Sequence, residues 1–142
     1  MGLYFKGESM NVLLLSIGAK HALVSFFKNS ESGFDKVVTT DCNRLSAGIY
    51  AGDAHYIVPK MKDESYLPTL LDICEKEKID AIIPSQEDEL VLISQNRNLF
   101  EEKNINVVTI INNYKQLLPF LLKITNVFDD NTRKNRDIRF KE

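Results

Sequence analysis

The hydrophobic and polar positions alternate along the chain between short apolar runs and longer segments with helical spacing. The apolar or β-branched runs are short enough to be strands, and turn residues flank most of them. They cover residues 11–17, 36–40, 55–58, 80–84 and 106–111. The first run is apolar at consecutive positions, which is typical of a parallel strand that is buried on both faces.

The segments between these runs predict helices over residues 19–29, from 65 to about 78, and over 86–101. In the first, Leu23 and Phe27 lie four residues apart on one apolar stripe. Ser65 and Ser85 are placed to cap the other two, and Asp88 completes an approximate capping box with Ser85. Residues 45–52 are rich in small side chains and predict a short helix or a turn.

Strands that alternate with helices indicate βαβ crossovers, which produce parallel sheets. The predicted fold is therefore α/β: a Rossmann-like open parallel sheet of about five strands, with helices on both faces. The domain is expected to span residues 10–111. Residues 1–9 stand apart as a native leader or the remnant of an expression linker. Residues 112–142 are expected to form an irregular helical segment, interrupted by Pro119, and then a polar tail.

Composition narrows the classes of function. A length of 142 residues suits one domain, and 44% hydrophobic and 27% charged residues are ordinary for a globular protein. A net charge of -2 does not favour binding to nucleic acid or to an anionic membrane, and no apolar run is long enough to span one. Cys42 and Cys74 form no disulfide framework, so both are expected to be buried thiols of a cytoplasmic protein.

The end of the first predicted strand carries the first candidate binding residues. Gly18 permits a tight turn and a close approach of the backbone to a ligand, and Lys20 and His21 could hold an anion at the start of the following helix. A dinucleotide fingerprint would place glycines at 16, 18 and 21, and only Gly18 is present, so a nicotinamide cofactor is not expected. A plain strand-to-helix turn remains the structural alternative.

Acidic residues follow two other predicted strands. Asp41 ends the second strand at nearly the spacing from Gly18 at which an acidic side chain reaches a ribose hydroxyl in dinucleotide folds. Glu87, Asp88 and Glu89 follow the fourth strand and could face a substrate, although helix capping already explains Asp88. The sequence contains no recognisable nucleophile–base pair, metal-ligand spacing or Walker motif.

Three stretches carry a family resemblance when they are taken together. They read MNVLLLSIGAKHALVSFFK from residue 10, VVTTDCNRLSAGIYAGDAHYIVP from residue 37 and DAIIPSQEDELVLIS from residue 80. Their order resembles the N-terminal, pre-ATP-grasp domain of ATP-grasp ligases, and the nearest members are carbamoyl-phosphate synthase large subunit-like proteins. The resemblance runs from about residue 10 to residue 108.

The resemblance implies a Rossmann-like domain that packs on ATP-grasp domains and forms one wall of the acceptor-substrate site. The ligases of this family use ATP and magnesium to activate a carboxylate as an acyl phosphate, which then joins an amine or a thiol. The residues that match the substrate-side loops are Ser16, Gly18, Ala19 and Lys20 after the first strand, Asp41 and Cys42 after the second, and Gln86, Glu87, Asp88 and Glu89 after the fourth.

The chain departs from the family pattern after the fifth predicted strand. The Asp-Lys pair that leads into the ATP-grasp domains is matched only by Leu122-Lys123, and the phosphate-binding and magnesium-binding residues have no counterpart. We therefore expect no catalysis and no cofactor in this chain alone, as in a truncated, split or decayed ligase. Its expected partner is an ATP-grasp domain in cis or in trans, or a second copy bound through the exposed docking face. The alternative is an independent module that binds a nucleotide or an anion through Gly18 and Asp41.

Overall fold

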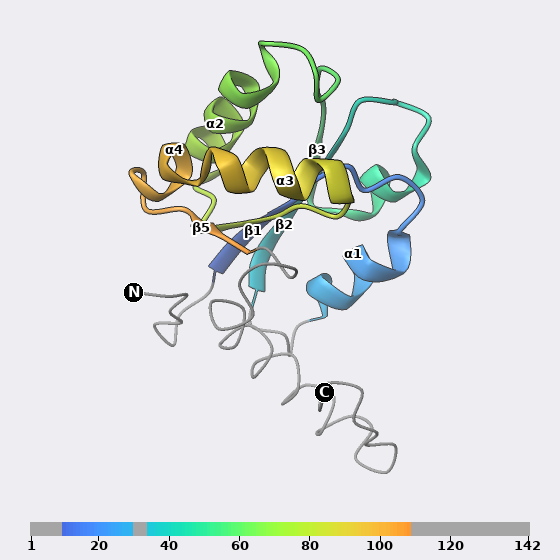
Figure 1. The fold of residues 1–142 in the computed structure, drawn as a ribbon. Coiled ribbons are helices and arrows are strands. Elements are labelled where there is room, and N and C mark those ends of the chain that lie inside the picture. The colour runs from blue at the N-terminus through green and yellow to red at the C-terminus, as the bar shows by residue number, and fades with distance from the viewer. Residues whose placement is uncertain (1–9, 30–33, 109–142) are drawn as a thin grey trace, which may run out of the picture.

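A parallel five-stranded sheet organises the computed structural model, which describes residues 10–29 and 34–108 (Figure 1). The strands are β1 (Met10–Leu14), β2 (Phe34–Asp41), β3 (Ala54–Ile57), β4 (Ala81–Ile83) and β5 (Asn106–Val107). The helices are α1 (His21–Lys28), the 3₁₀ helix η2 (Ala47–Ala51), α2 (Tyr66–Glu77), α3 (Glu87–Gln95) and α4 (Arg97–Glu101). The predicted fold class is confirmed.

The strand order is β3-β2-β1-β4-β5, so β1 lies at the centre of the sheet. Leu14 is in register with Thr39 on β2 and with Ile83 on β4. The chain builds outward from β1 to β3 and then crosses back to β4 on the other side of β1. In such a sheet, ligands bind outside the carboxyl ends of the strands on either side of this switch.

The two faces of β1 belong to two hydrophobic layers. Val12 and Leu14 pack on the α1 side, whereas Leu13 and Leu15 pack on the side of α2, α3 and α4. All four side chains are fully buried, because helices cover both faces of the sheet. This period of two explains why the sequence pattern shows an unbroken apolar run.

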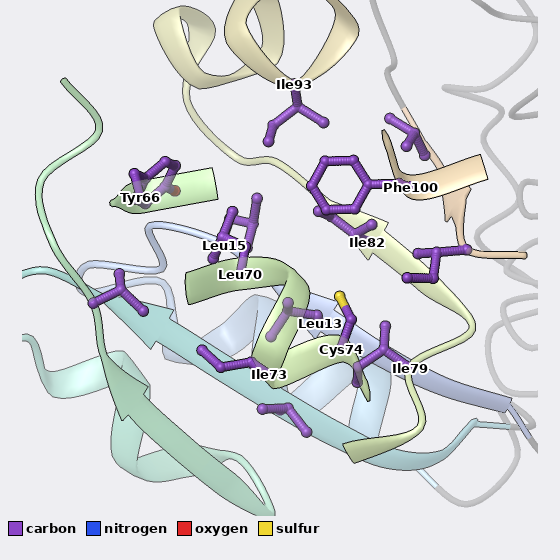
Figure 2. Packing of buried hydrophobic residues seen from close by; sticks show 14 residues of the cluster. Leu13, Leu15, Tyr66, Leu70, Ile73, Cys74, Ile79, Ile82, Ile93 and Phe100 are labelled. Atoms are coloured by element: carbon purple, nitrogen blue, oxygen red, sulfur yellow. The ribbon is translucent and has the colours of Figure 1, made fainter. Parts of the chain in front are cut away.

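Figure 2 shows the larger layer, in which helical side chains cover the central strands. Leu70 of α2 lies beside Leu15 and Cys74 of α2 lies beside Leu13, while Phe100 of α4 and Ile93 of α3 lie on the side of Ile82 of β4 (Figure 2). Cys74 is buried, as expected.

The prediction of one continuous helix over residues 86–101, capped by Ser85, is wrong. The segment forms two helices that are separated at Asn96, and α3 has Gln86 at its N-cap position. The Ser85 hydroxyl donates instead to the backbone oxygens of Leu15 (2.7 Å) and Ser16 (2.9 Å). Ser85 therefore ties α3 to the end of β1 rather than capping the helix.

Ser65 does occupy the N-cap position of α2, but its side chain makes no capping hydrogen bond. Its hydroxyl donates to Asp63 Oδ1 at 2.7 Å. The fifth strand is shorter than predicted within the described part of the chain, and residues 109–111 lie outside that part, as do the predicted leader and C-terminal segment. The three-part division of the chain stays a prediction.

Candidate functional site

The loops that follow β1, β2 and β4 meet at the carboxyl edge of the sheet. The Gly18 amide donates to Asp41 Oδ2 at 2.7 Å, which joins the first loop to the second. The Ser16 hydroxyl donates to Glu89 Oε2 at 2.8 Å, which joins the first loop to α3. Lys20 Nζ lies 3.5 Å from Ser85 Oγ on the loop after β4. Segments that are far apart in sequence therefore meet in one polar cluster, which is buried at Asp41 and Glu89 and exposed at Lys20.

The loop after β1 contains two residues in the left-handed backbone region. Gly18 has φ +53°, which glycine adopts without steric cost. Ser16 has φ +47°, which is uncommon for a residue with a side chain and needs support from its surroundings. The Ile17 amide donates to the Thr40 carbonyl (3.1 Å), and the Gly18 carbonyl accepts from the Gly48 amide (2.8 Å). Neighbouring segments thus hold the loop on two sides.

Asp41 is buried, and both of its carboxylate oxygens accept backbone hydrogen bonds. Oδ2 accepts from Gly18, and Oδ1 accepts from the Asn43 amide at 3.0 Å. The geometry gives Asp41 a structural task, which is to hold the loops after β1 and β2 together. Its use toward a ribose stays a prediction.

Glu89 is fully buried, although it stands in the first turn of α3 beside two exposed acidic residues. Its Oε2 accepts hydrogen bonds from the hydroxyls of Ser16 and Tyr66, while Oε1 has no hydrogen-bond partner. Burial raises the pKa of Glu89, and the hydrogen bonds from Tyr66 and Ser16 oppose that rise. Burial and the nearby Glu89 charge also raise the pKa of Tyr66. The carboxyl group is thus biased toward its neutral form.

This bias predicts a pH dependence of stability. A raised pKa means that the folded state keeps a proton which the unfolded chain releases near pH 4.5, so the contribution of Glu89 is complete below that pH and is lost as the pH rises through the folded-state pKa. Between these two pKa values, we expect the free energy of unfolding of Glu89→Gln to rise relative to that of the wild type by about 1.4 kcal/mol per pH unit. Urea unfolding of both proteins from pH 4 to pH 8 measures the gain. A constant difference across this range would contradict the buried neutral acid.

The other predicted site residues differ in exposure. Those on the surface are Ala19, Lys20, Cys42, Glu87 and Asp88, and those that are partly buried are Ser16 and Gly18. The structure brings Ser16, Gly18 and Asp41 into one network with Lys20 at its rim. It leaves the Glu87 and Asp88 side chains facing outward on α3. No group of three or more His, Cys, Asp or Glu side chains within residues 10–29 and 34–108 could hold a metal ion.

The expectation that Cys42 is buried is wrong, because it lies exposed directly after β2. Burial raises the pKa of the Cys74 thiol to about 12, so that thiol is both shielded and protonated. We expect a thiol reagent such as Ellman's reagent to label one cysteine of the native protein and both after denaturation. Cys42→Ser should abolish the native labelling, and rapid native labelling of that variant would contradict the burial of Cys74.

Tyr66 was not predicted as a site residue from the sequence, and Glu89 was not separated from its exposed neighbours Glu87 and Asp88. Glu89 lies four positions before Ile93, so it falls on the inward stripe of α3, and Tyr66 is four positions before Leu70 on the inward stripe of α2. A charged or hydroxyl-bearing side chain on a buried stripe needs a polar partner. That helical spacing was the available signal that each side chain is buried, and the hydrogen bond between Tyr66 and Glu89 is seen only in the structure.

Within the part of the chain that the structure describes, no helix is long and apolar enough to cross a membrane. A comparison with curated protein sequences gave no match. A comparison with solved structures matched a variant of Rhizobium etli pyruvate carboxylase bound to its allosteric activator acetyl coenzyme-A. The two are 20% identical with a TM-score of 0.47, and the match covers 70% of this chain and 10% of that one.

The family comparison covers nearly all of the described domain. The model of the PylC-like N-terminal domain matches residues 12–108, from β1 to just beyond β5. This range agrees with the stretch that resembles pre-ATP-grasp domains, and that resemblance is confirmed. The chain therefore belongs to the PylC-like N-terminal domain family, whose members are N-terminal domains of ATP-grasp enzymes.

Proposed function

We propose that this chain is the substrate-side domain of a carbamoyl-phosphate synthase-like ATP-grasp ligase, which joins a carboxylate to an amine or a thiol. In this proposal the 142 residues bind and orient the acceptor substrate, and ATP-grasp domains in cis or in trans supply ATP, magnesium and the chemical step. The observation that carries it is the convergence of the loops after β1, β2 and β4 at the carboxyl edge, through the Gly18–Asp41 and Ser16–Glu89 hydrogen bonds.

The charges at this edge favour a ligand with polar groups of both signs. Lys20 offers an exposed ammonium group beside Ser85, while Glu87 and Asp88 offer exposed carboxylates in the first turn of α3. An acceptor that carries both an amine and a carboxylate could pair with each kind of group. Asp41 contributes by fixing the loop backbone, because each of its carboxylate oxygens accepts a hydrogen bond from a backbone amide.

An exposed apolar surface lies in the connection between β2 and β3. Leu45 is 83% exposed and Tyr50 is 58% exposed, and the Tyr50 hydroxyl donates to the Arg44 carbonyl at 2.7 Å. Exposed large apolar side chains near a polar site are typical of a surface that another domain covers. We propose that Leu45 and Tyr50 form the docking face for an ATP-grasp domain or a second copy of the chain.

The test joins this chain to the ATP-grasp domains of a PylC-like ligase. We expect the chimera to release ADP from ATP in the presence of magnesium and an amino-acid panel, and the 142 residues alone to release none. The ATP-grasp domains without the chain serve as the control. ATP turnover by the 142 residues alone would contradict the proposal, and so would a chimera no more active than its control.

Titration of the isolated chain with ATP and AMP separates this proposal from an independent nucleotide-binding module. The substrate-side role predicts no binding of either nucleotide without the ATP-grasp domains. Saturable binding that is lost in Lys20→Ala but retained in the exposed control Lys62→Ala would favour the independent module.

A further inference from the structure

We propose that Glu89 is a positioning residue, whose carboxyl group ties Ser16 in the loop after β1 to Tyr66 on α2 and so fixes the backbone that presents Gly18 and Lys20. The use of this loop for substrate rests on the proposed function. The positioning itself depends only on the described contacts, so the two can fail separately.

The backbone of Ser16 shows why the loop needs an anchor. A non-glycine residue at φ +47° is disfavoured by its own side chain, and such conformations persist only where the surroundings hold them. The Ser16 hydroxyl contributes to that hold through its 2.8 Å hydrogen bond to Glu89, beside the hydrogen bond that the Ser16 carbonyl accepts from Ser85. The turn at Ser16 leads directly to Ile17, which is fully buried, and to Gly18.

Water cannot replace the hydrogen bonds of Glu89, because the side chain is enclosed by neighbouring elements. The side chain is fully buried, and its polar neighbours come from separate elements: Ser16 from the loop, Tyr66 from α2 and the Asp41 charge from the end of β2. Inside a buried site, a carboxyl group that loses such partners cannot recover them from solvent. The same carboxyl oxygen thus sets the loop relative to the α2–α3 layer.

Hydrogen exchange in the full chain tests this role without any ligand. The loop amides are those of Ile17 and Gly18, and the reference amides are those of Leu15 and Val108, which bond to β4 carbonyls in the sheet. We expect Glu89→Met, which has similar size but no carboxyl oxygen, to raise loop exchange about tenfold relative to the reference amides.

Two further variants make the outcome decisive. Glu89→Gln retains an acceptor oxygen and is expected to keep the loop-to-reference ratio within about threefold of the wild type. Glu87→Met, at the exposed neighbour, is the control and should leave the loop-to-reference exchange ratio unchanged. A uniform rise at all four amides in Glu89→Met, or equal loop opening in Glu89→Gln, would overturn the positioning role.

If Glu89→Met does not fold, Ser16→Ala removes the same hydrogen bond from the loop side. Because Ser16 is only partly buried, this variant is expected to fold and to show the same selective rise at Ile17 and Gly18. Unchanged loop exchange in Ser16→Ala would overturn the proposal on its own.

Discussion

Replacing Phe100 with alanine is expected to lower the free energy of unfolding by about 3–5 kcal/mol. Phe100 is fully buried and lies among Ile82, Ile93 and the other side chains of the larger layer (Figure 2). Its backbone carbonyl also accepts a hydrogen bond from the amide of Ile105, which directly precedes β5. The substitution therefore leaves a cavity where α3, α4 and β5 meet. Urea unfolding followed by circular dichroism measures the loss.

The matched control is Val91→Ala on α3, because Val91 is 49% exposed. A surface truncation of this kind is expected to change stability by no more than about 0.5 kcal/mol. Phe100→Leu should fall between the two, since it keeps part of the buried volume. A loss below about 1 kcal/mol for Phe100→Ala would show that α4 is not part of the cooperative core.

The sheet could be predicted because its evidence is local. The run around β1 is apolar on both faces, and helical stripes separate the apolar runs, so parallel βαβ units are the natural solution. The strand order is not local. Leu13 pairs with Val38 on one side and with Ile82 on the other, and no pattern within either strand names its neighbour.

The wrong prediction of a Ser85 cap also arises from non-local contacts, as the strand order does. Ser85 has the right residue type and position for a helix cap, yet its hydroxyl is taken by carbonyl groups at the end of β1. A propensity describes the average competition between local partners, and here a tertiary partner wins. The break between α3 and α4 at Asn96 also has no strong sequence signal. In the structure, the Asn96 side-chain amide donates a hydrogen bond to the Leu92 carbonyl.

The candidate site was only partly visible in the sequence. Gly18 and Asp41 were expected at strand ends, and the structure joins them directly. Glu89 was grouped with Glu87 and Asp88, because the helix dipole favours an acidic residue at any of these three positions in the first turn. Only burial separates them: Glu89 faces the loop after β1, whereas its two neighbours face outward.

Gly48→Ala is expected to destabilise the domain by about 1–3 kcal/mol and to displace the candidate substrate loop. An added Cβ would stand 2.7 Å from the Gly18 carbonyl oxygen and 3.3 Å from the Lys20 amide nitrogen. Both contacts are to backbone atoms, which cannot move aside as a flexible side chain does. The Gly48 amide also donates to that same Gly18 oxygen at 2.8 Å, so relief of the clash breaks the bond.

This variant separates a damaged loop from a damaged core. In the chimera with ATP-grasp domains, Gly48→Ala should reduce ADP release at temperatures where the domain stays folded, since the displaced atoms belong to Gly18 and Lys20. Phe100→Leu should reduce stability and leave that activity intact, because Phe100 packs in the other layer. The exposed neighbour Ala47→Ser should change neither quantity. Equal activity of Gly48→Ala and Ala47→Ser would contradict the assignment of the loop after β1 to the substrate.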